Sequence, residues 1–262
     1  MKKILILLYL LLIFGVPTLL AGAPLLLAFP LWVRLGYLLV MPLVFSFGFV
    51  LVAGLLSRPH QKGIVAGKFP RDMNHPVYGH RKLYGVCWTA VYYFKPVYFI
   101  FLSVPALQTF LFRLFGYKGN TDFTVYPDTW IRDLPLLDIG KGAYLSNRAT
   151  LGTNIVMKDG SILVGSIHIG EGALVGHLSV SGLGSKFGRD VQIGVGTMMG
   201  MKVRLDDEVD IAACARIDHG TSVGTGARLR SGAYIGSCSR IGSNAIIQGG
   251  AVLDPKSVVE AR

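Results

Sequence analysis

The stretch IAACARIDHGTSVGTGARL, residues 211–229, has an apolar residue at every sixth position: Ile211, Ile217, Val223 and Leu229. The same period runs from Ile139 to Leu253 and gives 20 hexads, in which position 1 is apolar everywhere except at Ser181. At 52% apolar composition the chance of such a match is on the order of 10⁻⁵. Position 5 carries only Ala, Ser, Thr, Val or Ile, and position 2 is Gly in 11 hexads.

A period of six matches neither the 3.6 residues of a helical turn nor the period of two of an alternating strand. It is typical of a triangular coil in which each hexad is a short strand plus a corner and three hexads close one turn. The apolar residue points inward, the small residue fits beside the corner, and Gly relaxes the bend. We therefore predict a mainly-β fold, a left-handed parallel β-helix over residues 139–262, with the hexads following one another without insertion.

The hexads resemble those of the hexapeptide-repeat, left-handed β-helix transferase superfamily over residues 139–258. The resemblance implies transfer of an acyl group from a coenzyme A or carrier-protein thioester. It also implies a homotrimer that binds its ligands on the prism faces or between prisms. Carbonic anhydrases share this fold and are a second possibility for the activity.

Two long apolar runs precede the repeat, Ile4–Val33 and Leu35–Ser57, separated by Arg34. Each reaches the roughly 20 residues that a helix needs to cross a bilayer. We predict that residues 1–57 form a transmembrane helical hairpin. The alternative is a signal peptide, because Lys2 and Lys3, an apolar core and a small-residue stretch at 21–23 have its three-part pattern.

Residues 58–138 are predicted to form a basic loop, membrane-associated helices and a lead-in to the repeat. Tyr84, Trp88, Tyr92 and Tyr93 suit the headgroup layer, so we expect helices lying at the interface. The alternative is a third, Pro-kinked span over 97–114. With two spans, the basic residues of segment 58–82 place the β-helix on the cytoplasmic side of an inner or plasma membrane.

The stretches 106–119 and 131–140 resemble the lead-in of a membrane-anchored subgroup, which is similar to the C-terminal membrane part of polylysine-type peptide synthetases. Residues 1–138 hold 13 basic and 5 acidic side chains, against 13 and 10 in 139–262. A basic half that is also apolar favours an anionic membrane surface over nucleic acid as a partner. The cysteines, which are Cys87, Cys214 and Cys238, form no CxxC pair and predict neither a disulfide framework nor a thiol zinc site.

His219 is the first candidate for a catalytic base. The segment 217–224 resembles the catalytic hexad of sugar acyltransferases of the superfamily, in which a histidine at position 3 is the general base. Gly220 stands where those relatives carry an acidic residue, so Asp218 is the substitute candidate for the orienting partner. Gly236 and Ser237, one turn later, are the candidates for holding the thioester oxyanion through backbone N–H groups.

His177 also occupies position 3, and Asp159 stands three hexads, or one full turn, earlier in the same column. An uninterrupted coil would stack Asp159 on His177 at roughly 5 Å, within reach of a hydrogen bond. A carboxylate that holds an imidazole in one tautomer is the usual arrangement for a base, but a solvated surface pair remains the alternative.

No metal site is expected. His177 and His219 are separated by two turns plus one hexad and should lie on different faces, whereas a catalytic zinc needs convergent ligands. The acidic run 205–210 is interpreted as a solvated corner. His60, His75 and His80 are interpreted as headgroup-zone or solvated residues.

These observations together predict a membrane-anchored acyltransferase of acetyl type. Acyl-CoA, in the first place acetyl-CoA, is its co-substrate, membrane lipid is a partner, and the acceptor is a hydroxyl or amine of a glycan, lipid-linked or peptide molecule. A histidine acts as the base. The alternative is a non-catalytic membrane-bound β-helix that serves as a scaffold or assembly module.

Overall fold

The chain folds into two compact units in the computed structural model, which describes residues 2–261. The helical unit comprises the residues up to Ile64 together with Arg71–Gly116. The solenoid unit comprises Val65–Pro70 and the chain from Tyr117 onward. The segment 58–138, which we expected to form one region, therefore contributes to both units.

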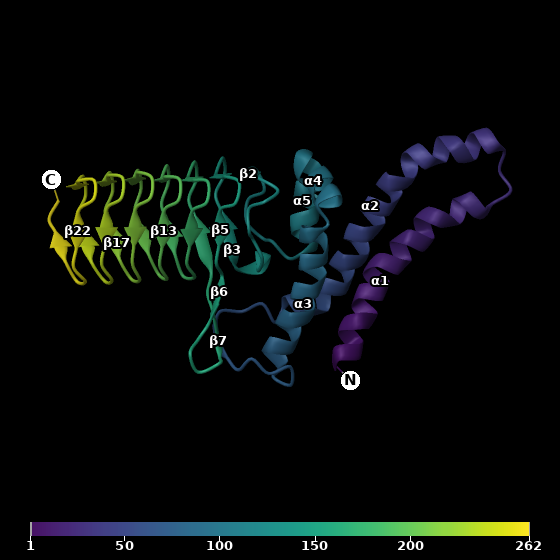
Figure 1. Ribbon diagram of the computed structural model, residues 1–262, viewed down its shortest axis with the longest axis horizontal. Helices are drawn as coiled ribbons and strands as arrows, with labels where there is room; N and C mark the ends of the chain where they lie inside the picture. Colours follow the sequence, from purple (N-terminus) through teal and green to yellow (C-terminus); the bar gives the residue numbers. More distant parts are fainter. Residues whose placement is uncertain (1, 262) are drawn as a thin grey trace. The chain divides into compact units, whose positions relative to one another are not determined.

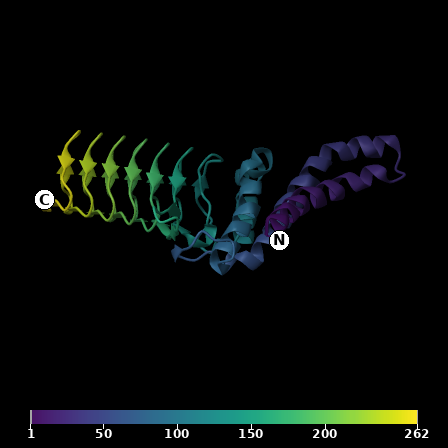
Figure 2. The same ribbon diagram turned by 60° about the horizontal axis from the view of Figure 1, so that its bottom comes forward.

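The solenoid unit is a parallel β-solenoid with three sheets, which confirms the predicted fold class (Figures 1 and 2). The first face contains β2 (Thr124–Val125), β4 (Tyr144–Leu145), β9 (Leu174–Val175), β12 (Gln192–Ile193), β15 (Asp210–Ile211), β18 (Arg228–Leu229) and β21 (Ile246–Ile247). The second face contains β5 (Thr150–Leu151), β10 (Val180–Ser181), β13 (Met198–Met199), β16 (Arg216–Ile217), β19 (Tyr234–Ile235) and β22 (Val252–Leu253). The third face contains β3 (Leu137–Ile139), β8 (Ile167–Ile169), β11 (Lys186–Phe187), β14 (Arg204–Leu205), β17 (Ser222–Val223), β20 (Arg240–Ile241) and β23 (Val258–Val259).

Position 1 of the hexads forms the core of the solenoid. Its residues are the second of each two-residue strand, and Leu145, Ile193, Ile217 and Ile235 are at most 1% exposed. The exception in the column, Ser181, is also fully buried. Position 6 alternates with position 1 and faces outward, as expected for a strand with one buried face.

The corners use two different positions for two different reasons. Position 4 adopts positive φ throughout the coils, with Gly142 at +68° and Glu208 at +59° as examples. The common glycine at position 2 instead allows neighbouring turns to approach. A methyl group at Gly170 would lie 2.1 Å from the Gly188 carbonyl oxygen. The prediction that position-2 glycine relaxes the bend is thus corrected: it makes room between turns.

The hexads are interrupted once, which the sequence analysis did not predict. Between β5 and β8 the chain leaves the coil as an antiparallel hairpin, β6 (Asn154–Val156) and β7 (Ile162–Val164), visible in Figure 1 as the projecting pair. β1 (Gly67–Phe69) pairs antiparallel with β7. Because Leu151 pairs with Ser181, five hexads later rather than three, the excursion adds two whole hexads. The period of six therefore continues unchanged through it.

The solenoid also begins earlier than residue 139. β2 pairs in parallel with β4, and Trp130 forms a bridge with Thr150, so the lead-in supplies the first turn. A short 3-10 helix, η2 (Leu134–Leu136), precedes β3. Beside it the buried Asp133 carboxylate accepts a hydrogen bond from the Thr153 hydroxyl at 2.6 Å.

The helical unit begins with α1 (Lys2–Gly22), η1 (Ala23–Leu26) and α2 (Leu31–Gln61). Two segments, Ile4–Leu26 and Leu31–Gln61, are long and apolar enough to cross a membrane. Their exposed side chains are mostly large and apolar, for example Leu19, Leu39 and Trp32. The break between them lies at 27–30, a few residues before the expected separator Arg34, which lies in the first turn of α2.

Three further helices follow: α3 (Pro76–Tyr93), α4 (Lys95–Ser103) and α5 (Pro105–Leu114). Each has a proline in its first turn, where the missing N–H costs no hydrogen bond. The segment 97–114 is thus broken at Val104 and forms no single spanning helix. α3 and α4 taken together are long and apolar enough to cross a membrane, but they are bent by 81° relative to each other, as in a broken span or a re-entrant loop.

Candidate active site on the third face of the solenoid

The outward residues of the third face form a row of ionisable side chains. Asp138 lies opposite His168, His168 opposite Lys186, and Lys186 opposite Arg204 in consecutive parallel strands. Adjacent strands are about 4.8 Å apart, so each side chain is a direct neighbour of the next. Ser222 and Arg240 continue the row. An acid, an imidazole and two cations therefore follow one another on one face.

Asp138 and His168 are in direct contact. The Asp138 Oδ2 atom lies 2.8 Å from His168 Nδ1, with 63% of the aspartate and 49% of the histidine side chain exposed. When the carboxylate accepts the Nδ1 proton of a neutral imidazole, the lone pair is on Nε2. This is the tautomer in which a histidine can take a proton from a substrate.

A surface pocket of about 440 Å³ adjoins this pair; it is lined by His168, Lys186, Phe187, Gly188, Arg204, Leu205, Asp206, Asp207 and Thr225. Two of its cations, Lys186 and Arg204, are exposed. Asp207 accepts the backbone N–H of Arg189 at 2.8 Å and its guanidinium at 2.8 Å. These two contacts, in that order, lower the pKa of Asp207. The pocket therefore combines an oriented imidazole with two cations, Lys186 and Arg204, and two carboxylates, Asp206 and Asp207.

His219 lies on a different corner, between the second and third faces, and is exposed. Its Nδ1 atom accepts the backbone N–H of Met201, one turn earlier, at 2.8 Å. A neutral imidazole held in this way carries its proton on Nε2. A base acting through Nε2 needs the opposite tautomer, with the proton on Nδ1, so His219 would first have to lose the hydrogen bond from Met201.

Asp218, the substitute partner for His219, points to other groups. The Tyr234 hydroxyl donates to Asp218 Oδ2 at 2.8 Å, and the Ser237 hydroxyl does so at 3.4 Å. The hydrogen bond to Asp218 raises the pKa of Tyr234. Gly236 packs tightly, since a methyl group there would lie 2.5 Å from the Pro255 nitrogen. The oxyanion role of Gly236 and Ser237 stays a prediction.

The expected stack of Asp159 on His177 is wrong. Asp159 lies at the tip of the β6–β7 hairpin, where it accepts hydrogen bonds from Lys68 Nζ at 2.5 Å and from the Ser161 hydroxyl at 2.5 Å. Val175, two residues before His177, pairs with Leu145. The neighbour of His177 is therefore the Asn147 region rather than Asp159. The two-hexad excursion is the reason for the difference.

Because of the same excursion, the sequence analysis did not predict that Asp138 and His168 are neighbours. Their separation of five hexads is one turn of three hexads plus the two hexads of the hairpin. The sequence does contain a signal: an outward acid and an outward histidine both stand one residue before a position-1 isoleucine. Within residues 2–261, no group of three His, Cys, Asp or Glu side chains could hold a metal ion.

His60, which we interpreted as a headgroup-zone or solvated residue, is buried. It is 7% exposed and lies within the helical unit, where its Nε2 atom is 2.8 Å from the Tyr9 hydroxyl oxygen. Its Nδ1 atom is 2.9 Å from His80 Nδ1. The burial follows from packing of α1 and α3 against the last turns of α2.

No protein-family model matches the chain, and no curated protein matches it in sequence. Solved structures do match. One is a point variant of perosamine N-acetyltransferase from Caulobacter crescentus in complex with CoA and GDP-perosamine, with 16% identity, a TM-score of 0.31, and coverage of 52% of this chain and 50% of the other. Another is UDP-N-acetylglucosamine acyltransferase from Campylobacter jejuni, with 14% identity, a TM-score of 0.34, and coverage of 55% and 65%. The matched regions thus span half to two thirds of those proteins.

Proposed function

We propose that the protein is a membrane-anchored acyltransferase, with acyl-CoA, in the first place acetyl-CoA, as the donor. The acceptor is a hydroxyl or amine of a glycan, lipid-linked or peptide molecule. The observation that carries the proposal is the Asp138–His168 pair at 2.8 Å on a hexapeptide solenoid, followed directly by two cations. The fold offers a face rather than an internal cavity, and the pair and the pocket lie on that face.

In the proposed reaction His168 Nε2 removes the proton from the acceptor oxygen or nitrogen, which forms a bond to the thioester carbonyl carbon. Asp138 stabilises the imidazolium that results. When the tetrahedral intermediate collapses, the carbon–sulfur bond breaks and the CoA thiolate takes the proton from the imidazolium. Lys186, one strand from His168, neutralises the oxyanion, and Arg204 binds a phosphate of CoA.

The alternative base within the same proposal is His219, supported by the hexad context of residues 217–224. In that case the Ser237 N–H provides the oxyanion contact, because the Gly236 N–H donates to the Leu253 carbonyl oxygen at 2.9 Å. The Met201 N–H donates to Nδ1 of His219 and so favours the tautomer of His219 that has its proton on Nε2. His168 already has the tautomer that the reaction requires, and this difference favours His168 as the base. His177 has lost its predicted carboxylate partner and is the third candidate.

The helices Ile4–Leu26 and Leu31–Gln61 anchor this enzyme in an inner or plasma membrane, with the solenoid in the cytoplasm. The basic residues that follow α2 support this orientation through the positive-inside rule. A cytoplasmic site has direct access to the acyl-CoA pool. A homotrimer is part of the proposal through the sequence resemblance.

The test is release of free CoA from acetyl-CoA by the detergent-purified full chain with a panel of glycan, lipid and peptide acceptors. His168→Ala should lower kcat/KM by about 10²–10⁴-fold, the range for removal of a general base. Asp138→Asn should lower it less, and His177→Ala, a half-buried histidine of the same solenoid without a carboxylate partner at the expected Asp159, should change it by less than about threefold.

Each variant is compared with the parent for its melting temperature, so that loss of chemistry is separated from loss of fold. A large loss with His219→Ala and none with His168→Ala would move the base to the neighbouring corner. Full activity of all three histidine variants contradicts the histidine mechanism. Absence of donor consumption with every acceptor favours the scaffold alternative.

A further inference from the structure

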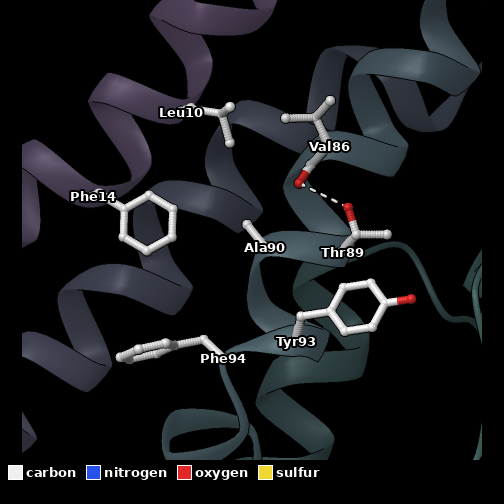
Figure 3. Close-up of a pocket in the computed structure, with 7 residues that line it drawn as sticks. All are labelled: Leu10, Phe14, Val86, Thr89, Ala90, Tyr93 and Phe94. Atoms are coloured by element: carbon white, nitrogen blue, oxygen red, sulfur yellow. Dashed lines mark hydrogen bonds between the residues drawn. The ribbon is translucent and has the colours of Figure 1, made fainter.

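The seam between α1 and α3 in the helical unit contains an apolar hollow that acyl transfer does not explain. It has a volume of about 450 Å³ and is lined by Leu10, Phe14, Val86, Thr89, Ala90, Tyr93 and Phe94 (Figure 3). The hydroxyl of Thr89 is engaged within its own helix, where it donates to Gly85 O at 2.6 Å. The atoms that line the hollow are therefore mostly carbon, which suits an apolar chain as the ligand.

A second hollow of about 170 Å³ lies farther along the same seam, toward the start of α3; it is lined by Leu5, His60, Met73, Asn74, His75, Pro76, Gly79, His80 and Leu83. On α3 the two linings follow one another from Gly79 to Tyr93, about 21 Å of helix. One leaflet of a bilayer has a hydrocarbon depth of about 15 Å. The seam is thus long enough to hold one chain of a lipid that has its headgroup near Gly79.

The end near Gly79 has polar and positive groups that complement an anionic headgroup. Tyr9, His60 and His80 form a hydrogen-bonded chain with distances of 2.8 and 2.9 Å. In the direction in which Tyr9 donates to His60 and His60 to His80, the remaining N–H on His80 Nε2 can donate to a ligand. Beside the hollow α3 begins, an 18-residue helix whose N-terminus carries partial positive charge.

Charged side chains add to the positive charge of the helical unit. The adjoining segments of the helical unit carry exposed cations, which are Arg58, Lys62, Arg71 and Lys82, against the single acid Asp72. Basic residues next to a membrane-spanning helix attract anionic lipids. Apolar lining at one end and positive groups at the other are the two halves of a phospholipid site.

We propose that the α1–α3 seam binds one molecule of an anionic phospholipid, with an acyl chain along Leu10, Phe14 and Ala90 and its phosphate at His80 and the start of α3. The proposal rests on the membrane placement of α1 and α2 proposed above and is independent of the acyl-transfer chemistry. A lipid held there packs α1 against α3.

The experiment uses the detergent-purified full chain and phosphatidylglycerol with a photoreactive diazirine in its acyl chain. After irradiation, labelled peptides should contain residues 10–14 and 86–94. Unlabelled phosphatidylglycerol should compete at least tenfold better than phosphatidylcholine of the same chains. Labelling spread over the exposed faces of α1 and α2, or equal competition by the two lipids, would overturn the proposal.

Ala90→Trp fills the hollow and should lower labelling of residues 10–14 and 86–94 at least tenfold. The matched control is Leu39→Trp on the exposed side of α2, where the residue is 82% exposed and labelling should not change. Unchanged labelling of a folded Ala90→Trp protein contradicts the proposal. If that variant does not fold, the labelling map and the lipid competition of the parent protein decide by themselves. Neither readout depends on acyltransferase activity.

Discussion

At the scale of single residues, the two glycine columns have separate physical roles and give separable predictions. Gly170→Ala places a methyl group 2.1 Å from the Gly188 carbonyl oxygen, which is backbone and cannot move alone. Gly142→Ala meets no atom within 4 Å and has only the strain of φ +68°. We expect a loss of unfolding free energy of about 1 kcal/mol for Gly142→Ala and clearly more for Gly170→Ala. Chemical denaturation measures both, and equal losses would contradict the two roles.

Ser181 gives a second prediction at this scale. Its side chain is buried in the core column, and within residues 2–261 its hydroxyl oxygen has no hydrogen-bond partner. Ser181→Val should stabilise the solenoid by about 1 kcal/mol, because a buried unsatisfied hydroxyl is replaced by apolar contact. The control is Ser179→Ala, which removes a hydrogen bond of 2.6 Å to Gly176 O and should destabilise. A lower melting temperature for Ser181→Val would count against this account.

Sequence periodicity predicted which residues form the core of the solenoid, because every coil places an inward-facing side chain at position 1. It did not predict that position 4 adopts positive φ. Half of those positions carry residues such as Leu178, Lys202 and Cys214, in which composition gives no sign of the conformation. At the candidate site, His219 was singled out by motif context, whereas His168 needed the strand register to find its partner Asp138.

At the scale of elements, the Lys68–Asp159 contact fastens β1 to the β6–β7 hairpin. Lys68 first, and then Ser161, hold the pKa of Asp159 well below its usual range. Because the carboxyl pKa is depressed, the contact stabilises the folded segment at every pH above the ordinary carboxyl pKa of about 4. This stabilisation is lost as the pH falls from there toward the lowered pKa. The pair is exposed, so salt should weaken it as well.

We therefore expect Lys68→Met to accelerate amide hydrogen exchange in β1 severalfold at pH 7 while the melting temperature of the solenoid stays unchanged. Lys158→Met, an exposed lysine next to Asp159, is the matched control and should have no effect. Equal exchange in both variants would show that the strand pairing of β1 with β7, and not the ion pair, holds the segment.

The helical elements show where periodicity stops being informative. Apolar runs predicted the two long helices, but α3, α4 and α5 were not separated by hydropathy alone. Their boundaries follow from Pro76, Pro96 and Pro105, each in a first helical turn. The cluster of the buried His60 with the half-buried Tyr9 and His80 depends on three helices meeting, which no local pattern contains.

At the scale of the whole molecule, topology is the prediction with the widest consequence. A reporter fused after Arg262 should be active only as a cytoplasmic reporter, because the basic residues after α2 retain that end inside. A reporter inserted after Phe29, between the two long helices, should give the opposite result. Activity of the Arg262 fusion on the outer side would mean that α3 and α4, bent by 81°, cross the membrane as a third span.

The excursion of residues 153–164, which contains the β6–β7 hairpin, is an insertion whose length is a multiple of the repeat. Removing residues 153–164 would join Gly152 to Gly165 and leave a complete hexad, with Ile169 six places after Leu151. Between Gly152 and Gly165, two whole hexads therefore leave the coil while Asp138 and His168 remain adjacent, so this corner of the solenoid accommodates a projecting segment. Evolution, or a protein engineer, can vary what projects from this corner without altering the catalytic geometry proposed for the neighbouring face.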